Sequence, residues 1–301
     1  MGPFNLQPVE GAGPSVSFEV ELRASEPFLD HHRPGGHPLF GTAMGIELMC
    51  RGATAATSTT KLLPARLSDV TVRSPIIVHD ATAVAFVTAT PTRAPDGAAF
   101  ACTITTHAKS NEVHFTAIVL LAANPRPTPH AARPNHGDTF PVNAAAIYSL
   151  FFHGPAFQVI AAAGLVGATM VSRIATQLPA LSSGNEDNDE TWVAMPRLIE
   201  ACLQTAGLLD IATRSKMMIP HGIDDIELFE TRPSPNEQLH ATARRTLSRS
   251  GTEAVDIDLQ HPDGSIVLRV RGYETRQLSF PTNQLGINTL NDAFQRHPNQ
   301  P

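Results

Sequence analysis

A stretch crowded with proline divides this chain and limits how it can fold. Between Asn124 and Asn143 the sequence reads NPRPTPHAARPNHGDTFPVN, with prolines at five positions. Proline has no backbone N–H and favours extended conformations, so the stretch is a poor fit to the interior of a helix or a sheet. We therefore interpret 124–143 as a linker. The residues on either side, 1–123 and 144–280, are then two halves that each bury apolar residues.

The two halves follow the same plan, in which strands precede and follow one long apolar helix. The helices are predicted at 41–56 and at 196–214, and the second has Pro196 in its first turn, where a missing N–H costs nothing. Segments rich in Val, Ile, Thr and Phe predict strands at 17–24, 67–78, 82–90, 99–107, 112–122, 157–174, 223–230, 238–247, 253–260 and 265–276. An apolar helix needs a sheet around it, so we predict an α+β fold with two antiparallel sheets, each wrapped around a central helix. The tail, 281–301, is rich in Asn, Gln and Pro and is predicted to be disordered.

Composition excludes several classes of function. The formal net charge of -6 argues against a nucleic-acid-binding protein, which usually has a basic face. No apolar run is long enough to predict a membrane-spanning helix. Three widely spaced cysteines give neither a disulfide framework nor a zinc motif, which favours a reducing, cytoplasmic setting. The thirteen histidines include no HExxH motif, so we predict no metal site.

Three short segments carry the strongest functional signal. The first is Phe28-Leu29-Asp30-His31-His32-Arg33-Pro34-Gly35-Gly36, which continues to Gly41-Thr42-Ala43. The second is His153-Gly154-Pro155-Ala156-Phe157-Gln158. The third is Pro196-Arg197-Leu198-Ile199-Glu200-Ala201-Cys202-Leu203-Gln204, at the start of the second predicted helix. Together, in this order, they resemble the dehydratase domains of polyketide synthases over about residues 16 to 280.

The resemblance implies a double-hotdog fold and assigns roles to particular residues. His32, with Gly36 four residues later, matches the catalytic histidine of the family, and Glu200 stands where the family has its catalytic aspartate. His153 replaces a tyrosine, and the loop before Gly41 is one residue shorter than usual. The resemblance places His153, Gly154, Pro155 and Phe157 along a substrate tunnel.

The chemistry of dehydration explains why these residue types are needed. Removing water from a β-hydroxyacyl thioester requires a base for the proton next to the carbonyl and an acid for the departing hydroxyl. A neutral His32 suits the base, and Glu200, if apolar neighbours keep it protonated, suits the acid. Gln204 lies one helical turn further on and either orients that carboxyl or is an ordinary polar helix residue. Backbone amides near Gly41 and Thr42 are expected to bind the thioester carbonyl.

Other readings of these residues stay open. Taken alone, His32 is a surface-turn histidine and Glu200 a first-turn acid favoured by the helix dipole. Tyr148 and Phe157 are predicted to be packing residues, and Cys202 a small buried apolar side chain.

The leading hypothesis is a lyase that dehydrates a β-hydroxyacyl chain tethered to an acyl carrier protein. The resemblance implies no cofactor beyond the carrier's phosphopantetheine, with ketosynthase and ketoreductase domains as neighbours; exposed sheet edges allow a homodimer. The alternatives are a product-template-like cyclase, a double-bond isomerase, or a non-catalytic domain that binds carrier-bound intermediates. Substrate chain length, stereochemistry and alkene geometry depend on the shape of the tunnel, which the sequence does not reveal.

Overall fold

The computed structural model describes residues 4–10, 13–57, 62–93, 97–106, 112–123, 126–131, 140–183, 192–229, 233–234, 236–277 and 283–296. Its strands are β1 (Gln7–Val9), β2 (Val16–Arg23), β3 (Leu39–Phe40), β4 (Leu63–Val72), β5 (Ile76–Ile77), β6 (Thr82–Thr92), β7 (Ala98–Thr105), β8 (Val113–Ala122), β9 (Val142–Asn143), β10 (Ile160–Val166), β11 (Thr169–Ile174), β12 (Met218–Leu228), β13 (His240–Leu247), β14 (Glu253–Gln260) and β15 (Ile266–Gln277). Its helices are α1 (Pro27–Asp30), α2 (Thr42–Ala56), α3 (Ala144–Tyr148), α4 (Pro196–Arg214) and α5 (Gln284–Arg296), with short 3-10 turns at Pro34–Gly36 and Pro155–Phe157.

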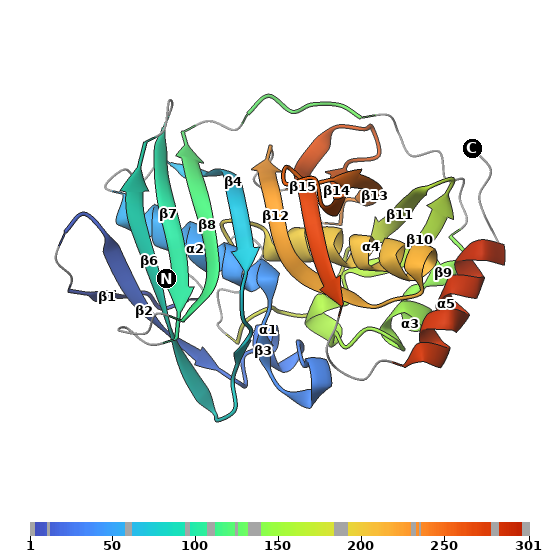
Figure 1. The fold of residues 1–301 in the computed structure, drawn as a ribbon, viewed down its shortest axis with the longest axis horizontal. Helices are drawn as coiled ribbons and strands as arrows, with labels where there is room; N and C mark the ends of the chain where they lie inside the picture. Colours follow the sequence, from blue (N-terminus) through green and yellow to red (C-terminus); the bar gives the residue numbers. More distant parts are fainter. Residues whose placement is uncertain are drawn as a thin grey trace.

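One large antiparallel sheet runs through both halves of the protein (Figure 1). The strand order is β1-β2-β6-β7-β8-β4-β12-β15-β14-β13-β11-β10-β9. The run β2-β6-β7-β8-β4 in the first half corresponds to the run β11-β13-β14-β15-β12 in the second, and in each run the first strand after the long helix, β4 or β12, lies at the junction. β4 and β12 pair with each other, with Ile223 opposite Val70. The two halves therefore share one topology and join edge to edge.

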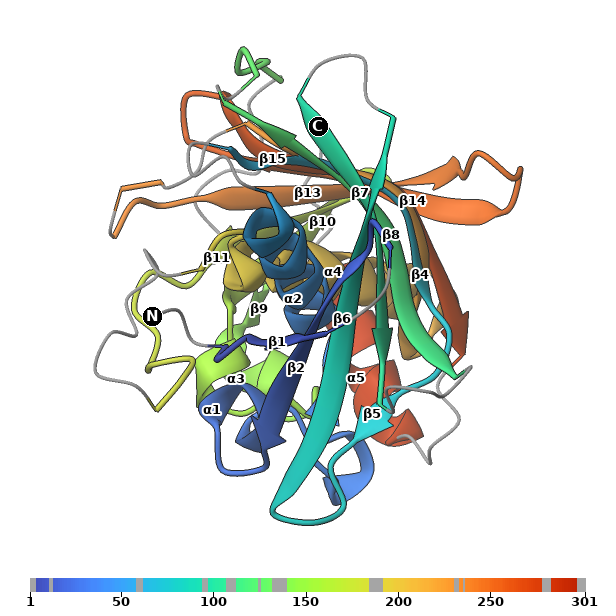
Figure 2. The same ribbon diagram turned by 90° about the vertical axis from the view of Figure 1, so that its left-hand side faces the viewer.

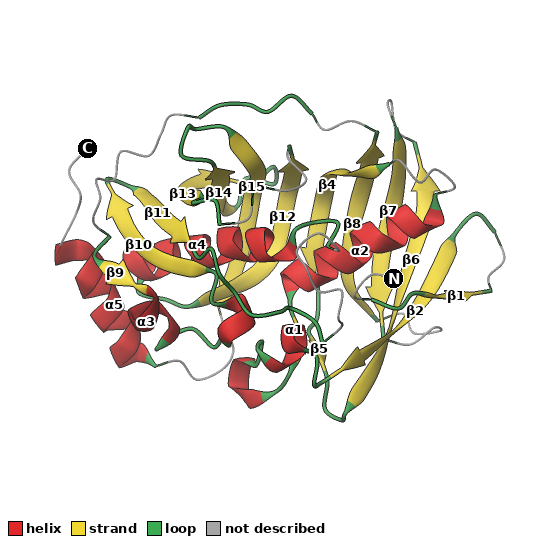
Figure 3. Ribbon diagram, turned by 180° about the vertical axis from the view of Figure 1, so that it is seen from behind, coloured by secondary structure: helices red, strands yellow, loops and turns green. Residues whose placement is uncertain are grey.

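The two long helices, α2 and α4, lie one after the other along the same face of this sheet (Figure 3). Viewed from the end, the strands curve around them (Figure 2). Most of their residues are buried, including Met44 and Met49 in α2 and Leu208 and Ile211 in α4. The predicted arrangement of a sheet wrapped around a helix, occurring twice, is confirmed.

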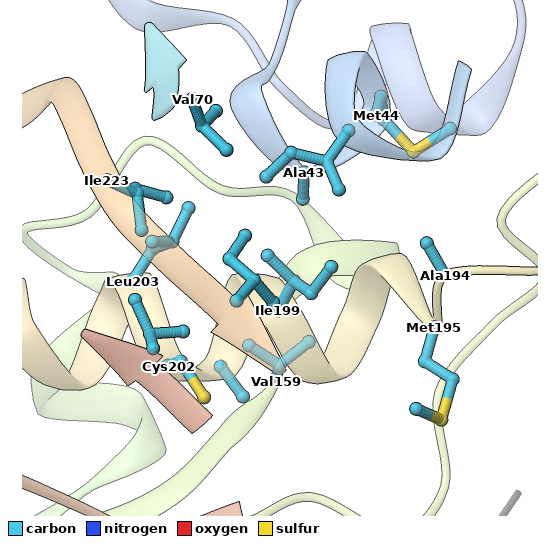
Figure 4. Close-up of a cluster of buried hydrophobic side chains, with 14 of the residues drawn as sticks. Ala43, Met44, Val70, Val159, Ala194, Met195, Ile199, Cys202, Leu203 and Ile223 are labelled. Atoms are coloured by element: carbon cyan, nitrogen blue, oxygen red, sulfur yellow. The ribbon is translucent and has the colours of Figure 1, made fainter. Parts of the chain in front are cut away.

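The helices meet end to end in a cluster of buried apolar side chains (Figure 4). Ala43 and Met44 reach it from the first turn of α2, and Ile199 from the first turn of α4. Val70 and Ile223, from the paired strands β4 and β12, cover the same cluster. The starts of both helices are thereby held close to the junction of the two halves.

Three local predictions differ from the structure. The predicted strand 67–78 breaks after Val72, before Pro75, and resumes as β5. The last two residues of the predicted linker form β9, which pairs with β10. The prediction of a disordered tail is wrong for Gln284–Arg296, which form α5. This helix packs on α4 through one apolar face, so local patterning prevails there over the polar composition.

Candidate active site

His32 follows the short helix α1 and is fixed on two sides. Its backbone carbonyl accepts a hydrogen bond from the Leu39 amide at 2.9 Å, and it forms an isolated β-bridge with His153 in the other half. Its Nδ1 lies 2.8 Å from the Leu39 carbonyl oxygen. A carbonyl can only accept, so Nδ1 carries the proton and Nε2 keeps its lone pair. The ring is thus held in the tautomer that a general base needs.

The surroundings of His32 keep its imidazole neutral. Burial lowers the pKa of His32 to about 4, and the nearby His153 acts in the same direction. The charge of Glu200 and the hydrogen bond to Leu39 oppose this shift only in part. An imidazole with so low a pKa is unprotonated at neutral pH and free to accept a proton.

Gly41, directly before α2, lies against the reactive nitrogen of His32. A Cβ atom at Gly41 would lie 3.1 Å from Nε2 and 3.2 Å from Cε1. Gly41 has ordinary extended backbone angles, so the need here is for space and not for an unusual conformation. The absence of a side chain at Gly41 is what leaves Nε2 accessible.

Glu200 lies in the first turns of α4, nearly fully buried, and one of its oxygens is strongly held. Oε1 accepts hydrogen bonds from Nε2 of His153 at 3.0 Å and from Nε2 of Gln204 at 3.0 Å. Within the described residues, Oε2 has no hydrogen-bond partner. Because two N–H groups already occupy Oε1, a proton on this carboxyl would lie on Oε2.

Gln204 is oriented by a chain of hydrogen bonds that extends to Tyr148. Its Nε2 donates to the Phe157 carbonyl at 3.0 Å as well as to Glu200. Its Oε1 accepts from the Tyr148 hydroxyl at 2.9 Å, and that hydroxyl accepts from the Ile160 amide at 2.7 Å. Gln204 therefore orients the carboxyl, whereas Tyr148, predicted as a packing residue, has a polar role. No short-range motif links Tyr148 to a residue 56 positions later.

The sequence predicts a protonated Glu200, but neighbouring side chains in the structure favour the ionised carboxylate. Burial alone would raise the pKa of the carboxyl, as expected from the sequence. The hydrogen bond and charge of His153, followed by His32 and Gln204, outweigh burial and lower the pKa below its usual value. In the unliganded site Glu200 is therefore ionised at neutral pH. His153 Nδ1 is buried without a hydrogen-bond partner within the described residues, whereas Nε2 faces the carboxylate and donates its proton to that hydrogen bond.

These side chains border a cavity of about 470 Å³, within the usual range for small-molecule sites. Five of the residues selected from the sequence line it: His32, Thr42, His153, Glu200 and Gln204. Sequence reasoning missed most of its apolar wall, which includes Phe115, Phe151, Phe152, Leu203, Gly207, Met217 and Met218.

The remaining candidates lie outside the cavity lining. Gly36 is exposed in a tight turn with φ of +89°, and nothing lies within 4 Å of where its Cβ would be. Gly154, Pro155 and Phe157, predicted as tunnel residues, are not among the residues that line this cavity. Gly154 packs against His31, and the buried Phe157 ring lies 6.0 Å from the His32 ring and 6.5 Å from the His153 ring.

Across the described ranges, no group of three or more His, Cys, Asp or Glu side chains could hold a metal ion. No helix in those ranges has the length and apolar character needed to span a bilayer. Cys202 is fully buried, and burial raises its pKa far above that of a reactive thiol.

Similar proteins of known structure share this fold. A dehydratase domain of a trans-AT polyketide synthase from Brevibacillus brevis has a TM-score of 0.74 and 18% identity, over 91% of this chain and 97% of that one. An inactive CurK dehydratase variant with a histidine replaced by phenylalanine has a TM-score of 0.71 and 17% identity, over 93% and 99%. A second inactive CurK variant, with an aspartate replaced by asparagine, has a TM-score of 0.72 and 18% identity, over 93% and 100%. The fold is the double hotdog.

Family models match both halves of the chain. The model described as "Polyketide synthase dehydratase domain" matches residues 7–107. The model described as "Polyketide synthase dehydratase N-terminal domain" matches residues 125–283, more than half of the chain. The two matches together include the five predicted residues that line the cavity, and the chain belongs to the dehydratase family of polyketide synthases, hydro-lyases that catalyse dehydration in polyketide biosynthesis.

Proposed function

We propose that the protein removes water from a β-hydroxyacyl thioester, with His32 as the base and Glu200 as the acid. The observation that supports this most is their convergence from opposite halves on one cavity, with Nε2 of His32 and Oε2 of Glu200 left without protein partners within the described residues. The inactive CurK variants replace a histidine and an aspartate, the same chemical types as this pair apart from one methylene.

In the first step of the proposed reaction, Nε2 of His32 takes the proton from the carbon next to the thioester carbonyl. The C–H electron pair moves toward the carbonyl, whose oxygen gains negative charge. The first-turn amides of α2 begin at Thr42, which lines the cavity, and Gly41 offers no side chain to cap them. Such amides, at the positive end of a helix, stabilise a developing oxyanion.

In the second step, the bond between the β-carbon and its hydroxyl breaks as Oε2 of Glu200 protonates the departing oxygen. Water leaves, a carbon–carbon double bond remains, and Glu200 becomes a carboxylate. The proton on His32 then passes to Glu200, which returns both side chains to the protonation states of the substrate-bound site. Filling the cavity with an acyl chain adds burial, the factor that raises the pKa of Glu200, so the carboxylate takes up a proton from solvent as substrate binds and releases it after the product leaves. Both steps are proton transfers between side chains and substrate, and we propose that they need no added cofactor.

We propose an acyl carrier protein as the substrate's donor, its phosphopantetheine arm entering the cavity. Arg73 and Arg276 line the cavity and are exposed, and within the described residues neither guanidinium has an ion-pair partner. A phosphodiester binds such guanidinium groups through charge-assisted hydrogen bonds. These two arginines are the contacts we propose for the phosphate of the arm.

Neighbouring ketosynthase and ketoreductase domains are the proposed context of this domain, because its substrate must first be condensed and then reduced. β1 and β9 end the large sheet, each paired with one strand within the described residues. Open strand edges of this kind can pair with another chain, so a homodimer is also proposed.

The test is a reaction with a β-hydroxyacyl chain loaded on a carrier protein, followed by mass spectrometry. The expected product has lost one water, and the loss disappears in His32→Ala and in Glu200→Gln. Arg73→Ala is expected to raise KM for the carrier-bound substrate more than KM for a small thioester analogue. A protein that leaves hydroxyacyl chains intact but changes the products of a poly-β-keto chain would instead be a cyclase.

A further inference from the structure

Glu47 is a buried acid in α2 that the proposed reaction does not use. It lies five residues after Thr42 in an otherwise apolar stretch of the helix, and its side chain has no exposed surface. A buried carboxylate is tolerated only where hydrogen bonds and opposite charge compensate for the lost water. The partners of Glu47 therefore indicate what this residue does.

Those partners lie mainly on the chain segment that leads into α4. Oε1 of Glu47 accepts from the Val193 amide at 2.9 Å, and Oε2 accepts from the Ala194 amide at 2.7 Å. Arg51, one turn further along α2, donates its Nε to Oε1 at 2.7 Å. Its guanidinium lies 5.8 Å from the centre of the Trp192 ring. One carboxylate thus binds two consecutive backbone amides from the other half of the protein.

The segment that Glu47 binds, Val193 and Ala194, leads directly into α4. Met195 follows directly, in a left-handed conformation with φ of +54° that is costly for a residue with a side chain. Pro196 then begins α4, and the Met195 carbonyl accepts from the amides of Leu198 and Ile199. Glu200 is the next residue. Only Met195 and the first turn of α4 lie between Ala194, which Glu47 binds, and the proposed acid Glu200.

The other end of the same stretch of α2 lies against the proposed base. Gly41 precedes the helix and lies close to Nε2 of His32. From Thr42 to Glu47 the helix rises about 7.5 Å, a short and rigid spacer. The start of α2 therefore lies against His32. Just over one turn later, Glu47 binds the segment that precedes α4, the helix that carries Glu200.

Apolar side chains also pack between α2 and the start of α4, but they do not fix the relative orientation of the two helices as the hydrogen bonds of Glu47 do. Met44 faces Ala194 and Met195 across the cluster where the helices meet (Figure 4). Packing of this kind is not directional, whereas the two amide hydrogen bonds fix both distance and orientation. We propose that Glu47 is a positioning residue of the active site, which sets the separation of His32 and Glu200 by binding the Val193 and Ala194 amides. The inference rests on the proposed roles of His32 and Glu200.

The test compares Glu47→Gln with Leu48→Ala on a hydroxyacyl carrier protein. Gln has the shape of Glu, but its NH2 group faces an N–H donor where an acceptor is needed. Because misplacement by about 1 Å can cost about 100-fold in rate, we expect kcat to fall at least about tenfold with KM changed less than about threefold. Leu48 is buried in the same helix and its apolar side chain cannot accept a hydrogen bond from these amides, so Leu48→Ala should lower Tm while kcat is kept. Equal kcat losses at matched stability would overturn the proposal.

A structural measurement separates this inference from the proposed function. In a crystal structure of Glu47→Gln, we expect the start of α4 to shift and the 3.0 Å contact between His153 and Glu200 to lengthen. That result would hold even if the wild-type protein left hydroxyacyl chains unchanged, which would refute only the proposed reaction. If Glu47→Gln does not fold, Glu47→Asp keeps the charge but shortens the reach by one methylene, and the same shift is expected. An unmoved α4 in the folded variant would refute the positioning role.

Discussion

His153 and Glu200 form a buried pair in which Nε2 of the imidazole donates to Oε1 of the carboxylate at 3.0 Å. The ring also stacks on Phe152, with centroids 4.4 Å apart, and lies 5.3 Å from the ring of His32. Two imidazoles and one carboxylate therefore share a small, mostly apolar space. The donor from His153 keeps Glu200 ionised in the unliganded site, so this pair controls when the acid carries its proton.

Replacing His153 by Phe should move the pH dependence of the reaction to higher pH. Without the donor, burial dominates and the pKa of Glu200 rises. An acid with a higher pKa keeps its proton to higher pH, so the alkaline limb of kcat/KM shifts upward. His153→Gln retains an N–H donor and should shift less. A profile of kcat/KM against pH for the three proteins measures this, and superimposable alkaline limbs would contradict it.

Gly41→Ala and Gly36→Ala should separate catalysis from stability. A methyl group at Gly41 would crowd Nε2 of His32 at 3.1 Å, so kcat should fall by about 100-fold, a loss typical of misplaced reacting groups. The backbone of Gly41 suits alanine, and Tm should change little. Gly36 has φ of +89° and open space around it, so alanine there should cost about 1 kcal/mol of stability with kcat kept. Thermal unfolding and initial rates distinguish the two, and a normal kcat in Gly41→Ala would contradict the role of that glycine.

The spacing of apolar residues explains both why the long helices were predicted correctly and why α5 was missed. The helix at 196–214 is the observed α4, because a proline at the first turn and a continuous apolar pattern act locally. α5 was missed because its average composition is polar. Its buried residues, Ile287, Leu290 and Phe294, still follow the spacing of one helical face. Composition averages over such a stripe, whereas packing against α4 depends on it.

The site was predictable only where a local motif carries it. His32, Glu200 and Gln204 fall in short segments whose order is distinctive, and the structure brings them together. The contacts of Glu47 involve backbone amides far along the chain, which have no sequence signature. The ionisation of Glu200 could not be predicted either, since its immediate sequence neighbours indicate burial and the decisive donor, His153, is distant.

His32 should make folding stability depend on pH. Its folded pKa of about 4 lies below the unfolded value of about 6.5, so the unfolded chain binds more protons between these two values. The associated stability, about 3 kcal/mol, is fully present above pH of about 6.5 and is lost as the pH falls toward about 4. His32→Gln lacks this group and should lose correspondingly less stability on acidification. Denaturant unfolding at several pH values measures the difference, and parallel curves would show that His32 is not buried as a neutral ring.

Gly207 should control the length of acyl chain that the cavity accepts. It lies in α4, one turn beyond Leu203 and Gln204 along the cavity wall, and a Cβ there would lie 3.6 Å from Cζ of Phe151. That distance is an ordinary contact, so Gly207→Ala should fit and stabilise the helix by about 0.5–1 kcal/mol. A leucine is too large for the same gap and must extend into the cavity or displace Phe151. Gly207→Leu should therefore lower kcat/KM for long hydroxyacyl chains more than for hydroxybutyryl, while Gly207→Ala keeps the wild-type preference. Equal losses at every chain length would mean that the acyl chain does not run along this wall.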